Sequence, residues 1–192
     1  MKIPVILVHG ISDDSSKMEH MAHFLRHRGW TVYSISLKPS SGQIGIDQLA
    51  EQLNTFINEK ITPTQKFDLI GFSMGGLVCR YYVQRITNPS HLDHFITLSS
   101  PHHGTLTAYL SRNKGARQMR INSEFLRDLN RDITKLNQLK FTSIWTPFDL
   151  MIIPSSSSRT GIGREIKIAA LAHPLMVKNQ KCLRAIETEL LR

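Results

Sequence analysis

Cysteines are scarce in this 192-residue chain, long apolar runs are absent, and acidic side chains are outnumbered by basic ones. The two cysteines, Cys79 and Cys182, are too few for a disulfide framework and lack metal-ligand spacing, so they favour a reducing compartment; one disulfide between them stays open. No stretch reaches the ~18 consecutive apolar residues of a membrane-spanning helix. The apolar part of the N-terminal run MKIPVILVHG is too short for a signal peptide and has no small-residue cleavage site, which predicts a cytoplasmic location; secretion stays open if the N-terminus has been trimmed.

The charge is unbalanced, with 24 Lys and Arg against 15 Asp and Glu and a net charge of +9. Such an excess favours nucleic acid or an anionic membrane surface as partner, or is a solvated basic face. Aromatic residues make up 7% of the chain and do not alternate with the basic ones, as base-stacking platforms would. We therefore expect no nucleic-acid partner and retain the membrane surface and the solvated face. The oligomeric state stays open.

Apolar runs alternate with amphipathic segments along the whole chain. Strands are predicted over residues 4–10, 31–37, 67–73, 94–101, 141–149 and 165–173. Helices are predicted over residues 15–29, 44–61, 74–86 and 175–191. This alternation predicts an α/β protein with a doubly wound, mostly parallel sheet, whose active groups lie at the carboxyl ends of the strands. At this length we expect one domain over residues 1–192.

The segment LIGFSMGG places glycines around a serine where a predicted strand meets a predicted helix. Gly71, Ser73 and Gly75 fit the G-x-S-x-G pattern, which alone is too common to be diagnostic. At a strand-to-helix junction the pattern predicts a nucleophile elbow, a sharp turn that exposes the serine hydroxyl at the helix N-terminus. The alternative is a plain glycine turn. We expect Ser73 to be the nucleophile.

A serine hydroxyl is a weak nucleophile at neutral pH and needs a general base. In a sheet of this kind the chain order is serine, acid, histidine, and His173 lies far downstream at the end of the last predicted strand. Asp149 ends the preceding predicted strand, so we expect it to orient His173; the alternative is a turn cap. Asp128 and Asp132 lie in a helical pattern, and Glu165 begins a strand, which places them away from the site.

Ester cleavage forms an oxyanion that needs preorganised hydrogen-bond donors. We expect the backbone N–H groups of Met74, directly after the nucleophile, and of Ile11, in the HGIS loop after the first strand. His9 in the same loop is expected to support it by hydrogen bonding. No phosphate loop, dinucleotide fingerprint or metal-ligand spacing is present in the sequence, so we expect neither a cofactor nor a metal.

The segments VILVHGI, DLIGFSMGGLVCRYYV and FITLSSPHHGT, followed by SEFLRDLN, resemble α/β-hydrolases of the bacterial lipase and esterase type. The compact length resembles the small lipase A-like members. The resemblance implies a minimal α/β-hydrolase fold without a large lid domain, and a carboxylic-ester hydrolase with the triad Ser73, Asp149 and His173. Phe72 replaces the histidine that many lipases carry before the serine, and Ser12 replaces a glycine often found in small lipases. These departures leave the substrate open.

The leading hypothesis is therefore a serine esterase or lipase that acts on small-molecule or lipid esters through an acyl-enzyme. A thioesterase or phospholipase with the same triad is the alternative, because the acyl-transfer chemistry is shared. A non-catalytic binding protein of the same fold is the third hypothesis.

The segment 104–140 is the least regular part and is expected to form a helical excursion near the mouth of the active site. It is rich in basic residues and carries an apolar stripe made of Phe125, Leu129, Ile133 and Leu136. The stripe either packs on the sheet as an ordinary helix face or forms a partial lid or membrane-facing rim. In both cases we expect an open cleft that acts on dispersed short to medium acyl esters.

Overall fold

Six strands form one sheet, in the order β2-β1-β3-β4-β5-β6, in the computed structural model of the protein, which describes residues 2–192. The strands are β1 (Val5–Val8), β2 (Val32–Ile35), β3 (Phe67–Phe72), β4 (Leu92–Leu98), β5 (Lys140–Trp145) and β6 (Arg164–Lys167). Every neighbouring pair is parallel, as predicted. The chain leaves β1 for β2 and then returns to β3 on the other side of β1, so the loops after β1 and β3 meet where the strand order reverses.

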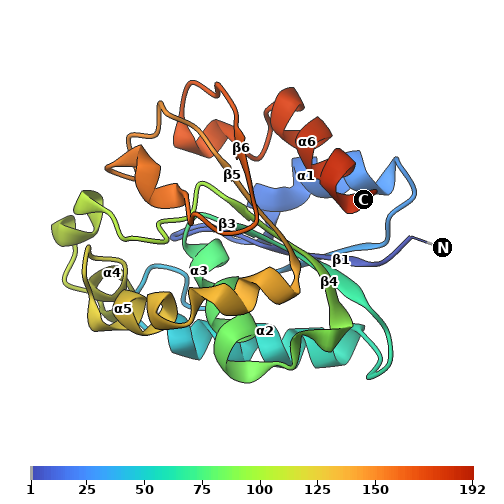
Figure 1. Cartoon of the computed structure of the whole chain (residues 1–192), viewed down its shortest axis with the longest axis horizontal. Coiled ribbons are helices and arrows are strands. Elements are labelled where there is room, and N and C mark those ends of the chain that lie inside the picture. Colours follow the sequence, from blue (N-terminus) through green and yellow to red (C-terminus); the bar gives the residue numbers. More distant parts are fainter. Residues whose placement is uncertain (1) are drawn as a thin grey trace.

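Helices cover both faces of the sheet (Figure 1). One face carries α1 (Glu19–Arg26) and α6 (Gln180–Leu190), and the other carries α2 (Ile46–Lys60), α3 (Met74–Tyr81), α4 (Lys114–Gln118) and α5 (Glu124–Arg131). Short 3-10 helices are η1 (Ser15–Met18), η3 (Pro89–His91), η4 (Leu106–Leu110), η5 (Ile133–Gln138), η6 (Ser155–Ser158) and η7 (His173–Leu175), and α3 continues into the π-helix η2 (Tyr82–Ile86). No helix within residues 2–192 is both long enough and apolar enough to cross a bilayer.

The core is divided by the sheet into two apolar clusters. Along β1, Val5 and Leu7 lie in the cluster beneath α1 and α6, whereas Ile6 and Val8 lie in the one beneath α2 and α3. A strand buried on both faces must be apolar at every position, which explains its continuous run. The two cysteines are buried in different clusters and are both free thiols, so the disulfide left open by the sequence does not form.

The last strands are shorter than predicted, and the final helix begins later. β5 ends at Trp145 and β6 at Lys167, because the ladder between them closes where the N–H of Ile168 donates to the carbonyl of Trp145 at 2.8 Å. The helix α6 begins at Gln180 because the side chain of Asn179 caps it, accepting from the N–H of two helix residues. Asp149 therefore lies in the loop after β5, and His173 begins η7, so neither residue is at a strand end.

The segment 104–140 folds into η4, α4, α5 and η5. Of the predicted stripe, Leu129 and Leu136 are buried, and Phe125 and Ile133 pack partly buried against the same cluster as α2 and α3. The Phe125 ring also stacks on that of Tyr81 at 5.7 Å. The stripe is thus an ordinary packed helix face, and its interpretation as a lid or rim is wrong.

A fully buried arginine, Arg80, ties the helix α3 to α5. It donates to the carbonyl of Leu129 at 2.7 Å and to the side chains of Gln84 at 2.7 Å and Asn130 at 2.8 Å. Burial lowers the pKa of Arg80 to about 9, because the charged form loses its hydration. These bonds hold the segment 104–140 against the helix that begins at the elbow.

Candidate active site

Ser73 occupies a strained turn between β3 and α3. Its φ of 55° and ψ of −125° are rare for a residue with a side chain, as a nucleophile elbow requires. The turn presses against neighbouring backbone: a Cβ on Gly75 would collide with the carbonyl of His9, and one on Gly71 would lie 2.6 Å from Cα of Gly76. Only glycine fits at both positions, so the glycines around Ser73 are required by packing.

His173 and Asp149 form a buried pair. The Nδ1 atom of His173 lies 2.7 Å from Oδ2 of Asp149, and their side chains are 7% and 1% exposed. The other carboxylate oxygen, Oδ1, accepts from the N–H groups of Met151 at 2.9 Å and Ile152 at 2.8 Å. Both oxygens are engaged, so the carboxylate is held in one orientation. A proton on Nδ1 then leaves Nε2 of the imidazole available as a base.

The pair lies beside the elbow. The ring of Phe72, the residue before Ser73, lies 4.8 Å from the ring of His173, measured between centroids. No hydrogen bond joins the Ser73 hydroxyl to His173 in the part of the chain that the structure describes. Such contacts are often long without substrate and tighten in the reacting complex. The structure brings the three predicted residues to one edge of the sheet.

Two backbone N–H groups lie near Ser73 without partners. The loop after β1 passes close to the elbow, since a Cβ on Gly10 would lie 3.1 Å from Cβ of Ser73. Ile11 of that loop and Ser73 line the same pocket. Within residues 2–192, neither the N–H of Ile11 nor that of Met74 donates a hydrogen bond. Two free donors are what a developing oxyanion needs.

His9 holds the loop after β1 in place. Its Nε2 accepts from the N–H of Leu37 at 2.9 Å, so the proton is on Nδ1, which donates to the carbonyl of Gly10 at 2.8 Å. Burial lowers the pKa of His9 and favours the neutral form. The supporting role predicted for His9 is confirmed by these bonds.

The other acidic residues that the sequence analysis considered form ion pairs with arginines. Asp128 and Asp132 pair with Arg85, each at 2.8 Å. Glu165 pairs with Arg159 at 2.7 Å.

His102 lies buried, with its Nε2 3.0 Å from Oγ1 of Thr97. Burial, and then the charge of Arg80, hold the pKa of His102 well below its usual range. A buried, neutral imidazole bonded to a threonine of β4 supports the rim of the site and does not reach substrate.

A pocket of about 200 Å³ opens at Ser73. Its apolar wall is built by Ile11, Ala108, Leu110, Met119, Met151 and Ile152. Sequence reasoning named Ile11 only as an oxyanion donor and missed the rest of this wall, because the other residues come from the segments 108–119 and 151–152, which carry no motif. The volume is below the roughly 300–1,000 Å³ typical of pockets for drug-sized ligands, so the pocket has room for a small group or for one part of a larger ligand.

A wider groove of about 750 Å³ lies between α4 and α5 and is lined by Tyr109, Arg117, Arg120 and Phe125, among others. None of Ser73, Asp149 and His173 lines it, so it is separate from the elbow.

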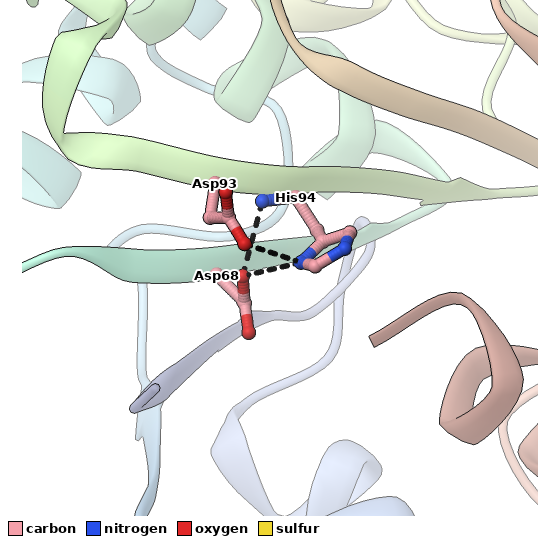
Figure 2. Close-up of side chains that lie close together, drawn as sticks. All are labelled: Asp68, Asp93 and His94. Carbon is pink, nitrogen blue, oxygen red and sulfur yellow. Dashed lines mark hydrogen bonds and ion pairs between the residues drawn. The ribbon is translucent and has the colours of Figure 1, made fainter. Parts of the chain in front are cut away.

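Ligand-type side chains also meet at the opposite edge of the sheet, where Asp68, Asp93 and His94 lie near the starts of β3 and β4 (Figure 2). Nδ1 of His94 lies 2.9 Å from Oδ1 of Asp68 and 3.3 Å from Oδ2 of Asp93. The same Asp68 oxygen accepts the backbone N–H of His94 at 3.0 Å, where the register of β3 and β4 shifts.

Lys140 offsets part of the negative charge of this cluster, because its ammonium lies 3.0 Å from the Asp93 carboxylate. A divalent cation would have to displace that ammonium. The cluster is therefore a polar contact between β3 and β4, at the edge of the sheet opposite to Ser73.

The parallel sheet, the elbow after β3 and the histidine–aspartate pair at the same edge define an α/β-hydrolase. Residues 4–148 match the sequence profile of the family described as "Palmitoyl protein thioesterase", and the chain belongs to this family. The match includes Ser73, whereas Asp149 and His173 follow it.

Curated relatives include both thioesterases and lipases. The chain is 35% identical to the human protein named "Lysosomal thioesterase PPT2" over 108 residues, which cover 53% of this chain and 34% of that protein. It is 29% identical to a "Triacylglycerol lipase" of Pseudarthrobacter phenanthrenivorans over 113 residues, covering 54% of this chain and 34% of the relative. The chain thus matches about a third of the length of these relatives.

Solved structures share the fold over nearly the whole chain. The mature lipase BlEst2 of Bacillus licheniformis superposes with a TM-score of 0.81 at 16% identity, covering 98% of this chain and 92% of that one. Lipase B of Aspergillus fumigatus superposes with a TM-score of 0.76 at 20% identity, covering 95% of this chain and 51% of that one. These likenesses confirm the α/β-hydrolase fold without a large lid domain.

Proposed function

We propose that the protein is a serine hydrolase that cleaves acyl thioesters and acyl esters, with Ser73 as nucleophile, His173 as general base and Asp149 as the group that orients the histidine. The bond between His173 and Asp149 beside the strained elbow carries this proposal. Residues 1–192 would act as one catalytic domain, in which the segment 104–140 supplies part of the pocket wall.

In the first half-reaction, Oγ of Ser73 attacks the acyl carbonyl carbon while Nε2 of His173 takes the hydroxyl proton. The carbonyl oxygen becomes an oxyanion and accepts from the N–H groups of Ile11 and Met74. When the tetrahedral intermediate collapses, the bond to the leaving thiol or alcohol breaks, and the imidazolium returns its proton to that group. The acyl group is left on Ser73.

In the second half-reaction, water replaces the leaving group. Nε2 of His173 takes a proton from water, whose oxygen attacks the acyl-enzyme carbonyl. Collapse of the second intermediate breaks the bond to Ser73, returns the proton to Oγ and releases the carboxylic acid. The carboxylate of Asp149 remains ionised throughout and stabilises the imidazolium.

Thioesters are the preferred substrate class in this proposal. The family and the relatives at 35% identity bear thioesterase names, whereas the lipase relatives are at 29%. A triad alone does not distinguish the two classes, because it acts on the same acyl carbonyl in both.

The experiment that tests the proposal uses a fluorophosphonate probe, which reacts with activated serine hydroxyls. We expect one adduct, on Ser73 by mass spectrometry, and none in Ser73→Ala. Acyl-CoA and p-nitrophenyl esters of equal chain length then compare the two classes, with kcat/KM expected to be higher for the thioester. Absence of the adduct in the folded protein would favour a non-catalytic binding protein.

A further inference from the structure

Exposed apolar side chains are gathered around the mouth of the pocket. Ten large apolar side chains are exposed in the described part of the chain, and nine of them lie in η4 and the segments 148–153 and 171–175. We call these nine side chains the apolar rim. The most exposed are Leu110 at 90%, Leu171 at 82% and Leu150 at 79%. The tenth, Leu191, directly follows α6 and belongs to none of these segments. Figure 1 marks the C-terminus beside α6.

The three segments of the apolar rim are joined to one another. The N–H of Leu106 donates to the carbonyl of Ile153 at 2.9 Å. The hydroxyl of Thr107 donates to the carbonyl of Met151 at 2.7 Å. The bond between Asp149 and His173 joins the second segment to the third. Because hydrogen bonds of backbone and side chains join the segments, the rim is a preformed surface and not a set of independent loops.

The pocket opens within the apolar rim. Leu110 and Met151 belong to the rim and also line the pocket of Ser73. A chain that leaves the pocket therefore meets apolar side chains before it meets water. Isolated exposed leucines need no explanation, but a continuous apolar patch around a binding site marks a surface that is covered in use.

Unpaired positive charge lies beside the apolar rim. Within residues 2–192, no carboxylate lies within ion-pair distance of Arg112, Arg117 or Arg120, which follow η4 directly. The guanidinium of Arg120 lies 4.9 Å from the centroid of the Tyr109 ring in the rim. Lys114, in the same segment, is instead paired with Asp47 at 3.5 Å. Three arginines without a carboxylate partner therefore lie close in sequence to the η4 part of the apolar surface.

We propose that the apolar rim docks on the surface of an anionic phospholipid bilayer, with the carboxyl edge of the sheet facing the lipid and the pocket of Ser73 opening into it. Anionic lipid attracts the unpaired arginines, and the rim enters the boundary between headgroups and acyl chains. Side chains that project separately from three segments fit a fluid acyl surface, whereas a protein partner would need a matching cavity for each. Only the role of the pocket rests on the proposed function; docking does not require turnover.

The test measures binding without hydrolysis, in protein that carries Ser73→Ala. Sedimentation with phosphatidylcholine vesicles is compared with sedimentation with vesicles that also contain phosphatidylglycerol. Leu150→Ser and Leu171→Ser are combined, since neither residue lines the pocket, and Leu191→Ser is the matched control. All three changes leave the net charge unchanged.

We expect stronger binding to the anionic vesicles that weakens with salt, and loss of affinity on the order of tenfold or more in the double variant. Leu191→Ser should bind as the parent does. Equal binding of parent and double variant, or equal binding to both vesicle types, would overturn the proposal. So would self-association that the double variant abolishes without vesicle binding, because the rim would then join two copies of the chain.

Hydrolysis of a short soluble ester by the same variants with Ser73 intact separates the two proposals. Vesicle binding without any hydrolysis would contradict only the proposed function. Hydrolysis without vesicle binding would contradict only the proposal that the apolar rim docks on a bilayer.

Discussion

Nδ1 of His173 and Oδ2 of Asp149 are 2.7 Å apart, although Asp149 lies in the loop after β5 and His173 begins the 3-10 helix η7. The carboxylate keeps this position because its second oxygen is held by the N–H groups of Met151 and Ile152. The loop after β5 thus supplies both the acid and the backbone that orients it. Loss of the Asp149 carboxylate should therefore affect catalysis more than folding.

Asp149→Asn should lower kcat on the order of 10⁴, because the amide N–H₂ would favour the wrong histidine tautomer. The backbone bonds to Oδ1 are retained, so the free energy of unfolding should change little. Steady-state kinetics and thermal unfolding measure the two effects. The control is Asp128→Asn, in a carboxylate that pairs with Arg85. Equal losses in the two variants would show that Asp149 has no special role.

Ser73→Ala should lower kcat on the order of 10⁴–10⁶, and His173→Ala should cost a similar factor. The double variant should be hardly worse than either single one, because the triad works as a unit. Single-turnover kinetics measure the three rates, and circular dichroism checks the fold. Retention of a tenth of the activity in Ser73→Ala, or additive losses in the double variant, would contradict the assignment.

Acid should destabilise the fold through the buried histidines. Burial lowers the pKa of His9 and of His102 below the ordinary 6.5. Below pH 6.5 the unfolded chain therefore binds protons that the folded chain does not, and stability falls by up to about 1.4 kcal/mol per pH unit for each proton. Above pH 6.5 this contribution to stability is fully present.

Denaturant unfolding of the wild type and of His102→Gln, at about pH 7.5 and about pH 5, measures this effect. The variant should lose less stability between the two pH values. Comparison at the higher pH isolates the packing cost of the substitution. An identical pH dependence would show that His102 does not couple folding to protons.

Narrowing the pocket should change the preferred acyl length. Ala108 lines the pocket and is buried, so Ala108→Leu places extra carbon atoms in a volume of about 200 Å³. The ratio of kcat/KM for octanoyl over acetyl esters should fall on the order of tenfold to a hundredfold, since each displaced methylene has a modest cost. Ala169→Leu, at an exposed position outside the pocket, is the control. An unchanged ratio would place the acyl chain elsewhere.

The elbow and the alternation of elements are local properties, so the sequence alone was enough to predict them. Gly71, Ser73 and Gly75 belong to one turn between a strand and a helix and lie within five residues of one another, although the close approach of His9 to Gly75 is a tertiary contact. The apolar runs likewise specify the strands, because a strand buried on both faces is mostly apolar. The order of serine, acid and histidine along the chain then sufficed to nominate Asp149 and His173.

Only the tertiary structure decided where the loops go and what stays exposed. The strands β5 and β6 end early, and the path of their loops depends on bonds to distant segments, such as that from Thr107 to Met151. The stripe on α5 and η5 is buried or half-buried, whereas Leu110 in a segment without periodicity is 90% exposed. The sequence shows which side chains are apolar. Whether each is covered depends on neighbours far away in the sequence, because burial is a property of the packed chain.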